Sequence, residues 1–336
     1  MVFLEDRGHD FEKYYLGKLE SLGVSYSFLG RVARKNPFKG VLGFRRIIKS
    51  FKPDVVHCHN YYFSVFSLFS FCKTPSFVYT HHNIELSKSL ILYKFLDKKI
   101  DAYIGICQTC YVKLCAVASK PVVRVDNGAS SERVASSLDD ASPKGNKRKV
   151  NITYVGRLFD KKNVHLLVSA FAKVKLTHPG LQAELHIVGD GPQRKMLESL
   201  CEKKGVEQDV YFHGRVSDVP VYLAAADIFA LSSISEGLPI SLIEASLFGL
   251  PTISTNVGGC SEVSHEVGNG VVVDSLDVDE YARKLSRLVV DIEYRDALAN
   301  NARKYSGHYS IERVVREHLS LYSRLTNSVQ LEKSNF

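Results

Sequence analysis

Several features that mark membrane, secreted and repeat proteins are missing from this sequence. The longest apolar run near the start of the chain, at 61–72, is broken by serines and is too short to cross a bilayer core of about 30 Å. The amino terminus, MVFLEDRGHD, has acidic residues where a secretory signal has basic and apolar ones. No repeat of fixed period stands out, which argues against solenoids and propellers. We therefore expect a cytoplasmic protein that is neither exported nor anchored by a transmembrane helix.

Cysteine and acidic patterns give little support for a metal site. The seven cysteines are an odd number at irregular spacing, which predicts free thiols in a reducing compartment. Cys107 and Cys110 form a CxxC pair, with Cys115 nearby, but no second pair completes a zinc site. Asp277 and Asp279 imitate a metal-binding DxD motif, yet they begin an amphipathic segment, where a helix-capping Asp is the simpler interpretation. We predict no bound metal.

A dinucleotide cofactor is also unexpected. The GDG triplet at 189–191 could open a dinucleotide-binding fingerprint, but Arg194 stands at the third glycine position. The sequence therefore predicts no resident cofactor.

Composition and length indicate a globular chain of two domains. Of the 336 residues, 45% are hydrophobic and 24% are charged, as in ordinary folded proteins, and at about 150 residues per domain the length favours two domains. The net charge of +8 is unevenly spread. Residues 1–150 carry 24 Lys and Arg against 13 Asp and Glu, whereas residues 151–336 carry 20 against 23. The basic character therefore belongs to the first half.

One segment concentrates this basic charge. Residues 31–52 include eight basic residues and no acid, with Val41, Phe44, Ile48 and Phe51 at helical spacing. The pattern predicts a basic amphipathic helix after a basic loop. Such a helix can lie on an anionic membrane or bind polyphosphate; the alternative is a helix that packs on a sheet and leaves a solvated basic face. No zinc-finger, RNP-like or helix-turn-helix pattern accompanies the charge, so nucleic acid is not an expected partner.

Short apolar runs alternate with helical patterns along the whole chain, which predicts an α/β fold of parallel sheets covered by helices. The expected strands are 2–4, 24–29, 54–59, 76–81, 102–106 and 122–125, then 150–156, 183–189, 210–214, 228–233, 251–255 and 270–273. We expect two Rossmann-like domains, at 1–137 and 150–309, that face each other across a cleft and are joined by a polar linker at 138–149. An amphipathic helix at 310–325, before a polar tail, could pack back on the first domain.

The segment 232–263 carries the most chemistry. After an expected strand come Glu236, Gly237 and Pro239, and then a helix that holds Glu244. Pro suits a helix start, Gly lets a ligand approach the backbone, and free amides at a helix start bind phosphate. Because parallel sheets bind ligands beyond the carboxyl ends of their strands, Glu236 could face a sugar and Glu244 a ribose cis-diol. The alternative is two ordinary carboxylates favoured by the helix dipole.

These residues resemble the retaining glycosyltransferases of family 4, which have the GT-B fold and a signature of two Glu separated by seven residues. Three further segments match the family's donor-phosphate strand and loop, its glycine turn and its nucleobase region, namely 155–171, 187–197 and 212–233. All four motifs occur in the family's order, so the signal does not depend on one motif. The resemblance implies a GT-B fold of two Rossmann-like domains.

The resemblance also implies roles for the matching residues. Arg157 and Lys162, next to Gly156, would hold the donor diphosphate, and fixed cations there would stabilise the charge of the leaving nucleoside diphosphate. Glu236 would lie beside the donor sugar as the catalytic carboxylate, and Glu244 would bind the ribose. The remaining donor contacts would come from the backbone of Arg215, Val216, Gly237, Leu238, Pro239 and Ile240.

Two strands of the first half resemble the family's acceptor-domain strands, at 51–60 and 77–83. The resemblance implies that His82 is the catalytic-pocket histidine near the donor sugar; a satisfied residue at a strand end is the alternative. Asn83 is assigned to the acceptor side. By strand alternation His57 and His59 point to the same face and could border the acceptor, although core packing explains them equally well.

The sequence departs from the family pattern in two places. Asn163 replaces the glycine that usually follows the family's lysine, a mild change because Asn tolerates a left-handed backbone. The family also begins with a strand, a glycine-rich loop and a helix before the strand that 2–4 matches, and none of these precedes Met1. Two explanations stay open, a true start further upstream or a degenerate homologue, and the intact donor motifs favour the first.

The expected function is transfer of a sugar from a nucleotide donor, a UDP-sugar, to a lipid-linked or cell-surface saccharide, with retained configuration and without a metal. The enzyme would lie on the inner face of the membrane through 31–52. The alternatives are another GT-B enzyme, such as a sugar-nucleotide epimerase or a phosphorylase, or a truncated inactive homologue that acts as a binding subunit.

Overall fold

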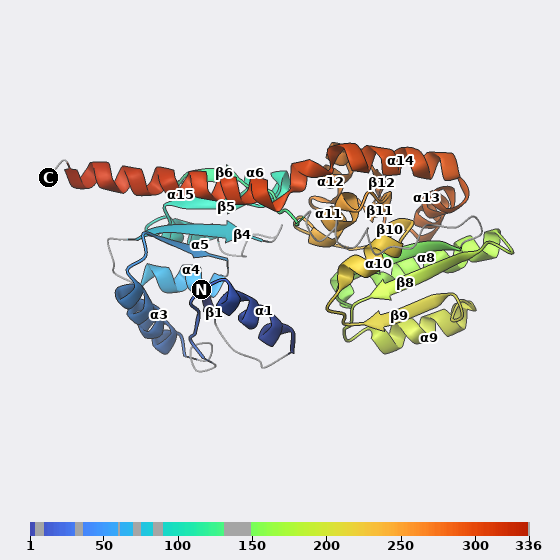
Figure 1. The fold of residues 1–336 in the computed structure, drawn as a ribbon, viewed down its shortest axis with the longest axis horizontal. Coiled ribbons are helices and arrows are strands. Elements are labelled where there is room, and N and C mark those ends of the chain that lie inside the picture. Colours follow the sequence, from blue (N-terminus) through green and yellow to red (C-terminus); the bar gives the residue numbers. More distant parts are fainter. Residues whose placement is uncertain are drawn as a thin grey trace.

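The protein consists of two α/β domains that lie side by side, with a long C-terminal helix that returns from the second domain across the first (Figure 1). The computed structural model describes residues 1–3, 10–30, 36–59, 61–69, 75–82, 90–130 and 149–334. The arrows of β4 and β9 point toward each other in Figure 1, so carboxyl ends of strands from both domains face the boundary between them.

The N-terminal domain, as far as it is described, has six parallel strands in two sheets, of orders β1-β2 and β3-β4-β5-β6. The strands are β1 (Val2–Phe3), β2 (Ser27–Phe28), β3 (Val55–Cys58), β4 (Ser76–His81), β5 (Ala102–Gly105) and β6 (Val122–Arg124). The helices are α1 (Asp10–Ser21), α3 (Pro37–Phe51), α4 (Tyr61–Leu68), α5 (Leu90–Leu96) and α6 (Gln108–Cys115). Every strand lies within a segment where the apolar pattern predicts one.

The C-terminal domain has a single parallel sheet of order β12-β11-β10-β7-β8-β9 among the described residues. Its strands are β7 (Val150–Val155), β8 (Ala183–Val188), β9 (Val210–Gly214), β10 (Ile228–Leu231), β11 (Thr252–Thr255) and β12 (Gly270–Val273). Its helical elements are η1 (Asp160–Lys162), α8 (Val164–Thr177), α9 (Arg194–Lys204), α10 (Val219–Ala225), α11 (Ile240–Leu247), α12 (Cys260–Val267), α13 (Val278–Val290), α14 (Ile292–Tyr305) and η2 (Ser306–Tyr309). The strand order reverses between β7 and β10. Parallel sheets bind ligands beyond the carboxyl ends of such strands, and we call this region the crevice.

The cores explain why the apolar runs form strands. β4 and β10 are buried along their whole length, as expected for parallel strands covered on both faces. The main core also includes Ile106, Cys107 and Cys110 from the N-terminal domain. Because these side chains pack with those of the C-terminal domain, the two domains share apolar contacts at their boundary.

The C-terminal helix α15 (Ile311–Ser334) covers one face of the four-stranded sheet. Leu321 is buried among Val78 and Ile104, and Tyr322 packs at the edge of the same cluster. The helix continues to Ser334, so the predicted helix end at 325 is wrong. The residues after 325 include no Gly or Pro, and Glu, Lys and Gln are good helix formers.

The basic segment forms α3, whose first amides are capped by Asn36 through a 3.3 Å bond from the Lys39 amide. Residues 31–35 lie outside the described residues. Phe44 and Ile48 are buried as predicted, but Phe51 is 72% exposed, so its place in the apolar stripe is wrong. Phe51 ends the helix, and the left-handed Lys52 turns the chain away.

Candidate active site

Two loops meet at the crevice between β7 and β10. The loop after β7 contains Lys162, and the loop after β10 contains Ser233 and Glu236. The Lys162 Nζ and the Ser233 hydroxyl both donate to Glu236 Oε1, each at 2.5 Å. The side chains are largely withdrawn from solvent, with 22% of Lys162 and 10% of Glu236 exposed. A fixed cation and a fixed carboxylate therefore lie together where a parallel sheet binds its ligand.

The loop after β7 is held by the glycine turn after β8. A side chain on Gly189, which has a φ of +135°, would place its Cβ 1.9 Å from the Gly156 carbonyl oxygen, so only glycine allows this contact. The Leu158 amide donates to the Asp190 carbonyl at 3.0 Å. Asn163 is left-handed, with a φ of 45°. The position therefore has the conformation that the family's glycine would adopt, and Asn tolerates it as predicted.

The side chain of a buried tyrosine is hydrogen-bonded to the backbone of the same loop. The Tyr154 hydroxyl donates to the Arg157 carbonyl at 3.2 Å. Burial, and then the negative charge of Glu236, raise the pKa of Tyr154. The hydroxyl therefore stays a neutral donor and fixes the backbone at Arg157.

Helix α11 points its amino terminus into this region. Pro239 is the residue before the first helical turn and makes no side-chain cap, one position earlier than the helix start that the sequence suggests. The first amides of α11 have no partner within the helix, which makes them suited to an anion. Glu244 lies half-buried within the helix.

The two domains touch at the same place. A side chain on Gly237 would put its Cβ 2.8 Å from the His82 carbonyl oxygen, so the glycine allows the loop to lie against the end of β4. The Asn127 side chain of the N-terminal domain donates to the Leu238 carbonyl at 3.0 Å. The Glu236 loop is thus attached directly to the other domain.

Histidines from β3 and β4 form a cluster on the N-terminal side of this contact. The rings of His57 and His59 lie 4.0 Å apart, and His59 Nδ1 lies 3.0 Å from His82 Nε2. Burial, and then the neighbouring histidines, lower the pKa of His57 to about 2 and that of His59 to about 4. Burial and His81 also lower the pKa of His82. The cluster is therefore neutral near pH 7, where it can donate and accept hydrogen bonds.

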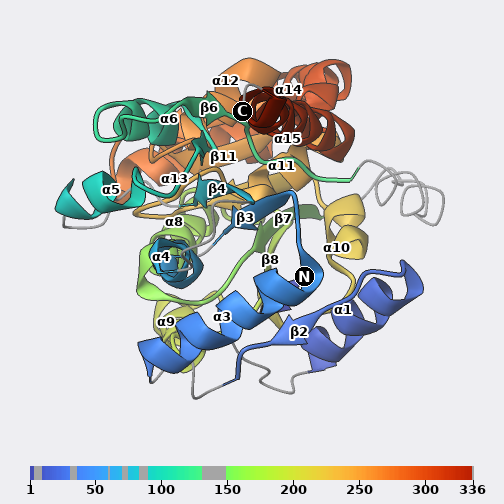
Figure 2. The same cartoon turned by 90° about the vertical axis from the view of Figure 1, so that its left-hand side faces the viewer.

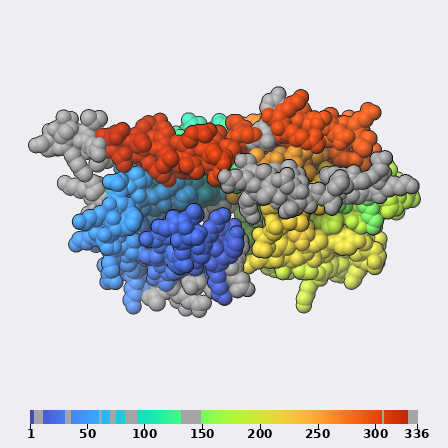
Figure 3. Space-filling model, in the orientation of Figure 1, coloured from blue at the N-terminus to red at the C-terminus, as the bar shows by residue number. Residues whose placement is uncertain are grey.

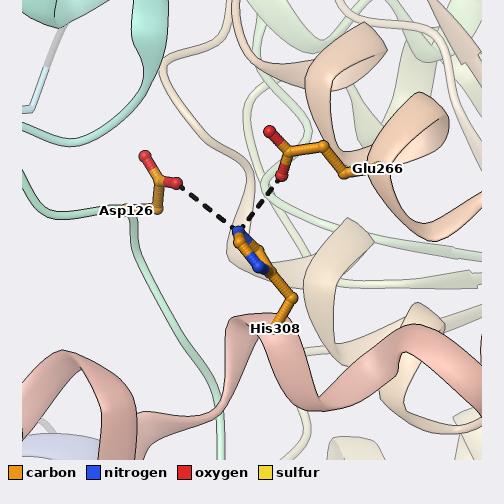
Figure 4. Close-up of side chains that lie close together, drawn as sticks. All are labelled: Asp126, Glu266 and His308. Atoms are coloured by element: carbon orange, nitrogen blue, oxygen red, sulfur yellow. Dashed lines mark ion pairs between the residues drawn. The ribbon is translucent and has the colours of Figure 1, made fainter.

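Asp126, Glu266 and His308 form a second polar contact between the domains (Figure 4). His308 on η2 lies 3.3 Å from Glu266 on α12 and 4.0 Å from Asp126, which follows β6. Arg124 pairs with Asp126 at 2.6 Å and with Glu266 at 3.3 Å. Within the described part of the chain, Asp126, Glu266 and His308 are the one group close enough together to hold a metal ion. Because Arg124 already compensates both carboxylates, we interpret the group as an ion-pair network between the domains.

Comparison with known proteins identifies the family. A model described as "Glycosyl transferases group 1" matches residues 137–305, and one described as "Glycosyltransferase Family 4" matches residues 2–133. The chain belongs to glycosyltransferase family 4. Both domains are covered by these matches.

Individual relatives of this glycosyltransferase agree with the family. An uncharacterized glycosyltransferase of Methanocaldococcus jannaschii is 29% identical over 298 residues, which cover 81% of this chain and 75% of that protein. A lipopolysaccharide core biosynthesis glycosyltransferase, LpsE of Rhizobium meliloti, is 32% identical over 50% of this chain and 48% of its own length. The structure of HepE from Anabaena in complex with UDP-glucose has a TM-score of 0.76 at 19% identity, covering 93% of this chain and 89% of that chain. The fold is therefore GT-B, as the sequence predicts.

The remaining predicted site residues of this glycosyltransferase lie in loops that follow strands of the C-terminal sheet. Arg157 is exposed, and its guanidinium lies 5.2 Å from the Phe159 ring. Arg215 and Val216 lie in the loop between β9 and α10. The structure brings Lys162, Glu236, Gly237 and His82 together, whereas Asn83 lies outside the described residues, as does most of the linker at 138–149.

The motifs set aside in the sequence have structural explanations. Asp277 accepts bonds from the Asp279 and Glu280 amides and so caps α13, which confirms the helix-cap interpretation. Cys107 caps α6 by accepting a bond from the Cys110 amide. The six cysteines in the described residues are not joined in disulfides, as predicted.

Several residues at the site are not predicted from the sequence. Ser233 lies only three residues before Glu236. A hydroxyl so close in sequence to the predicted catalytic carboxylate is a signal that could have identified it. Asn127 follows the expected strand at 122–125, but nothing in the sequence pairs it with Leu238. Tyr322 and Thr80 bind His57 from a distant helix and a neighbouring strand, and no local pattern indicates this.

Proposed function

We propose that this glycosyltransferase moves a sugar from a UDP-sugar to a lipid-linked or cell-surface saccharide, with retained anomeric configuration and without a metal or cofactor. The observation that supports this most is the Lys162–Glu236 ion pair, which lies beside the uncapped start of α11 and against His82. A cation, free amides and a carboxylate are thereby held at the boundary where a donor and an acceptor would meet.

The chemistry follows from these groups. Breaking the bond between the sugar C1 and the phosphate oxygen leaves a negative charge on the nucleoside diphosphate, which Lys162 and the α11 amides would stabilise. Glu236 already accepts bonds from Lys162 and Ser233, which suits an orienting carboxylate better than a nucleophile. We propose that the acceptor oxygen attacks C1 on the face that the phosphate leaves, and that its proton passes to the departing phosphate oxygen.

The donor and acceptor classes rest on the relatives. HepE, which shares the fold, has been solved in complex with UDP-glucose, and LpsE is named for lipopolysaccharide core biosynthesis. A uridine nucleotide donor and a saccharide acceptor of a cell-surface glycan are therefore the first substrates to test.

The test is transfer by the purified protein. Nucleotide sugars are screened for thermal stabilisation, and the best donor is incubated with saccharide acceptors in the presence of EDTA. We expect a glycoside with the anomeric configuration of the donor. Glu236→Gln should lower kcat by at least about 100-fold, whereas Glu207→Gln, at an exposed glutamate, should not. Wild-type rates in Glu236→Gln, an inverted product or a rearranged donor without transfer would contradict the proposal.

We further propose that α3 holds the enzyme on the cytoplasmic face of an anionic membrane. Phe38 and Leu42 are 83% and 61% exposed, and four basic residues of the helix are exposed beside them, Lys39, Arg45, Arg46 and Lys49. Each basic side chain near an anionic surface contributes about 1 kcal/mol. Figure 2 shows α1 and α3 on the side of the N-terminal domain away from α15, and Figure 3 shows the space-filling surface of the molecule. None of the described helices is both long and apolar enough to span a membrane.

Vesicle sedimentation tests the membrane proposal. The protein should sediment with phosphatidylglycerol vesicles and much less with phosphatidylcholine vesicles, and added salt should release it. Phe38→Ser combined with Arg46→Gln should weaken binding at least several-fold. Leu176→Ser removes a side chain that is 79% exposed on the other domain and serves as the control. Equal binding of both variants and the wild type would exclude α3 as the contact.

A further inference from the structure

The C-terminal helix reaches the histidine cluster through one hydrogen bond. His57 Nδ1 lies 2.5 Å from the Tyr322 hydroxyl of α15, and His57 Nε2 lies 2.6 Å from the Thr80 hydroxyl of β4. Both ring nitrogens of His57 therefore have partners. The contact joins residues 265 positions apart in the chain, and α15 holds it in place by packing Leu321 into the sheet.

The two hydrogen bonds of His57, to Tyr322 and to Thr80, must run in opposite directions because His57 is neutral. A pKa of about 2 leaves one ring nitrogen with a proton and the other with a lone pair at pH 7. One of the two hydroxyls must then donate to the ring while the other accepts from it. Hydrogen bonds on both sides thus fix the orientation of the ring.

The fixed His57 ring lies behind the pair that faces the solvent. His59 stacks against His57 with the centroids 4.0 Å apart and contacts His82 through ring nitrogens 3.0 Å apart. His318 of α15 adds a fourth ring, 5.4 Å from His57. His59 and His82 keep a larger exposed fraction than His57, which is half-buried.

The neutral His59–His82 pair has a defined polarity. One of the facing nitrogens carries the shared proton, so in either arrangement the outer nitrogens, His59 Nε2 and His82 Nδ1, comprise one donor and one acceptor. A sugar hydroxyl also donates one proton and accepts others, so it can bind both outer nitrogens.

We propose that Tyr322 is a positioning residue that holds the His59–His82 pair, through His57, for a hydroxyl of the acceptor saccharide. This role depends on the proposed transferase function. The C-terminal helix thereby contributes to the acceptor site without contacting the substrate.

The experiment compares two hydroxyl deletions on α15. Tyr322→Phe removes the bond to His57 and keeps the ring that packs on the sheet. Thr326→Val is the matched control, because its hydroxyl bonds only to carbonyls of α15. Ring nitrogen signals of His57, His59 and His82 are recorded by NMR, and initial rates are measured with the donor alone and with the acceptor.

We expect Tyr322→Phe to shift the ring signals of His57 and His59, to raise the acceptor KM at least threefold, and to leave UDP binding and donor hydrolysis at wild-type values. Thr326→Val should change none of these. Unchanged histidine signals, an unchanged acceptor KM in an active enzyme, or an equal loss of donor binding would overturn the proposal. If the wild type transfers no sugar, the proposed function fails, whereas the NMR comparison still tests whether Tyr322 orders the cluster.

Discussion

The two sides of the crevice are built in different ways. On the C-terminal side, Lys162, Ser233 and Glu236 come from two loops of one sheet. These loops follow β7 and β10, the two strands between which the strand order reverses. On the N-terminal side, the histidine cluster needs β3, β4 and a helix from the far end of the chain. We call these the donor side and the acceptor side.

This difference has a functional meaning. Under the proposed function the donor side would supply charge, which must be fixed where the leaving phosphate develops its own charge. The acceptor side uses neutral rings, whose pKa values are lowered by burial, and neutral groups suit the exchange of hydrogen bonds with an uncharged hydroxyl. Damage to the donor side should therefore reduce every reaction of the donor, and damage to the acceptor side should reduce transfer alone.

Lys162→Met should give the largest effect. It removes the cation beside Glu236 and leaves that carboxylate, which is only 10% exposed, without its ionic partner. We expect kcat/KM to fall by about 100- to 1000-fold for both donor hydrolysis and transfer. The control is Lys161→Met, at the exposed neighbouring lysine. Loss of transfer with normal donor hydrolysis would show that the charge belongs to the acceptor side and would break the comparison.

Gly237→Ala tests the point where the two sides touch. The added Cβ would lie 2.8 Å from the His82 carbonyl oxygen, so the Glu236 loop or the end of β4 must move. We expect transfer, measured as the initial rate, to fall at least about tenfold because small displacements of reacting groups are costly. Gly17→Ala, where no atom lies within 4 Å of the new Cβ, is the control. Wild-type transfer by Gly237→Ala would mean that this contact is not needed.

The same difference determines what the sequence could predict. The donor side can be predicted from the sequence because Glu236, Gly237 and Glu244 lie within one strand-loop-helix segment, and apolar runs predict the strands. The acceptor side can be predicted only in part. Strand alternation places His57 and His59 on one face of β3, but it cannot identify Tyr322 as their neighbour. The predictions for Phe51 and for the helix end at 325 are wrong for another reason. Local periodicity does not determine where a helix ends or where it leaves the sheet.

The neutral state of His57 should appear as a pH dependence of stability. Its folded pKa of about 2 lies below the ordinary value of 6.5, so the unfolded chain binds a proton that the folded chain does not. Stability is then fully present above about pH 6.5 and falls as the pH is lowered, by about 1 kcal/mol per pH unit for this half-buried ring.

Urea unfolding between pH 7.5 and 5.5 measures this contribution. His57→Gln should flatten the pH dependence of the unfolding free energy, because the amide does not titrate. His165→Gln, at an exposed histidine of α8, is the control for general effects of losing a histidine. Equal slopes in the wild type and His57→Gln would mean that His57 binds protons alike in the folded and unfolded chains, and the lowered pKa of His57 would have to be abandoned.

The smallest effect is expected at Asn163, which tests how strictly the donor loop needs its backbone shape. At a φ of 45°, alanine carries the steric cost of a left-handed residue, whereas glycine carries none but gains entropy in the unfolded chain. Asn163→Ala should therefore lower the unfolding free energy by about 0.5–1 kcal/mol, and Asn163→Gly should stay within about 0.5 kcal/mol of the wild type. Thermal unfolding of both variants gives the order. Should alanine prove as stable as glycine, the left-handed turn is not required by the fold, and the donor loop would owe its shape to the Ser232 hydroxyl, which donates to the Asn163 carbonyl at 2.9 Å.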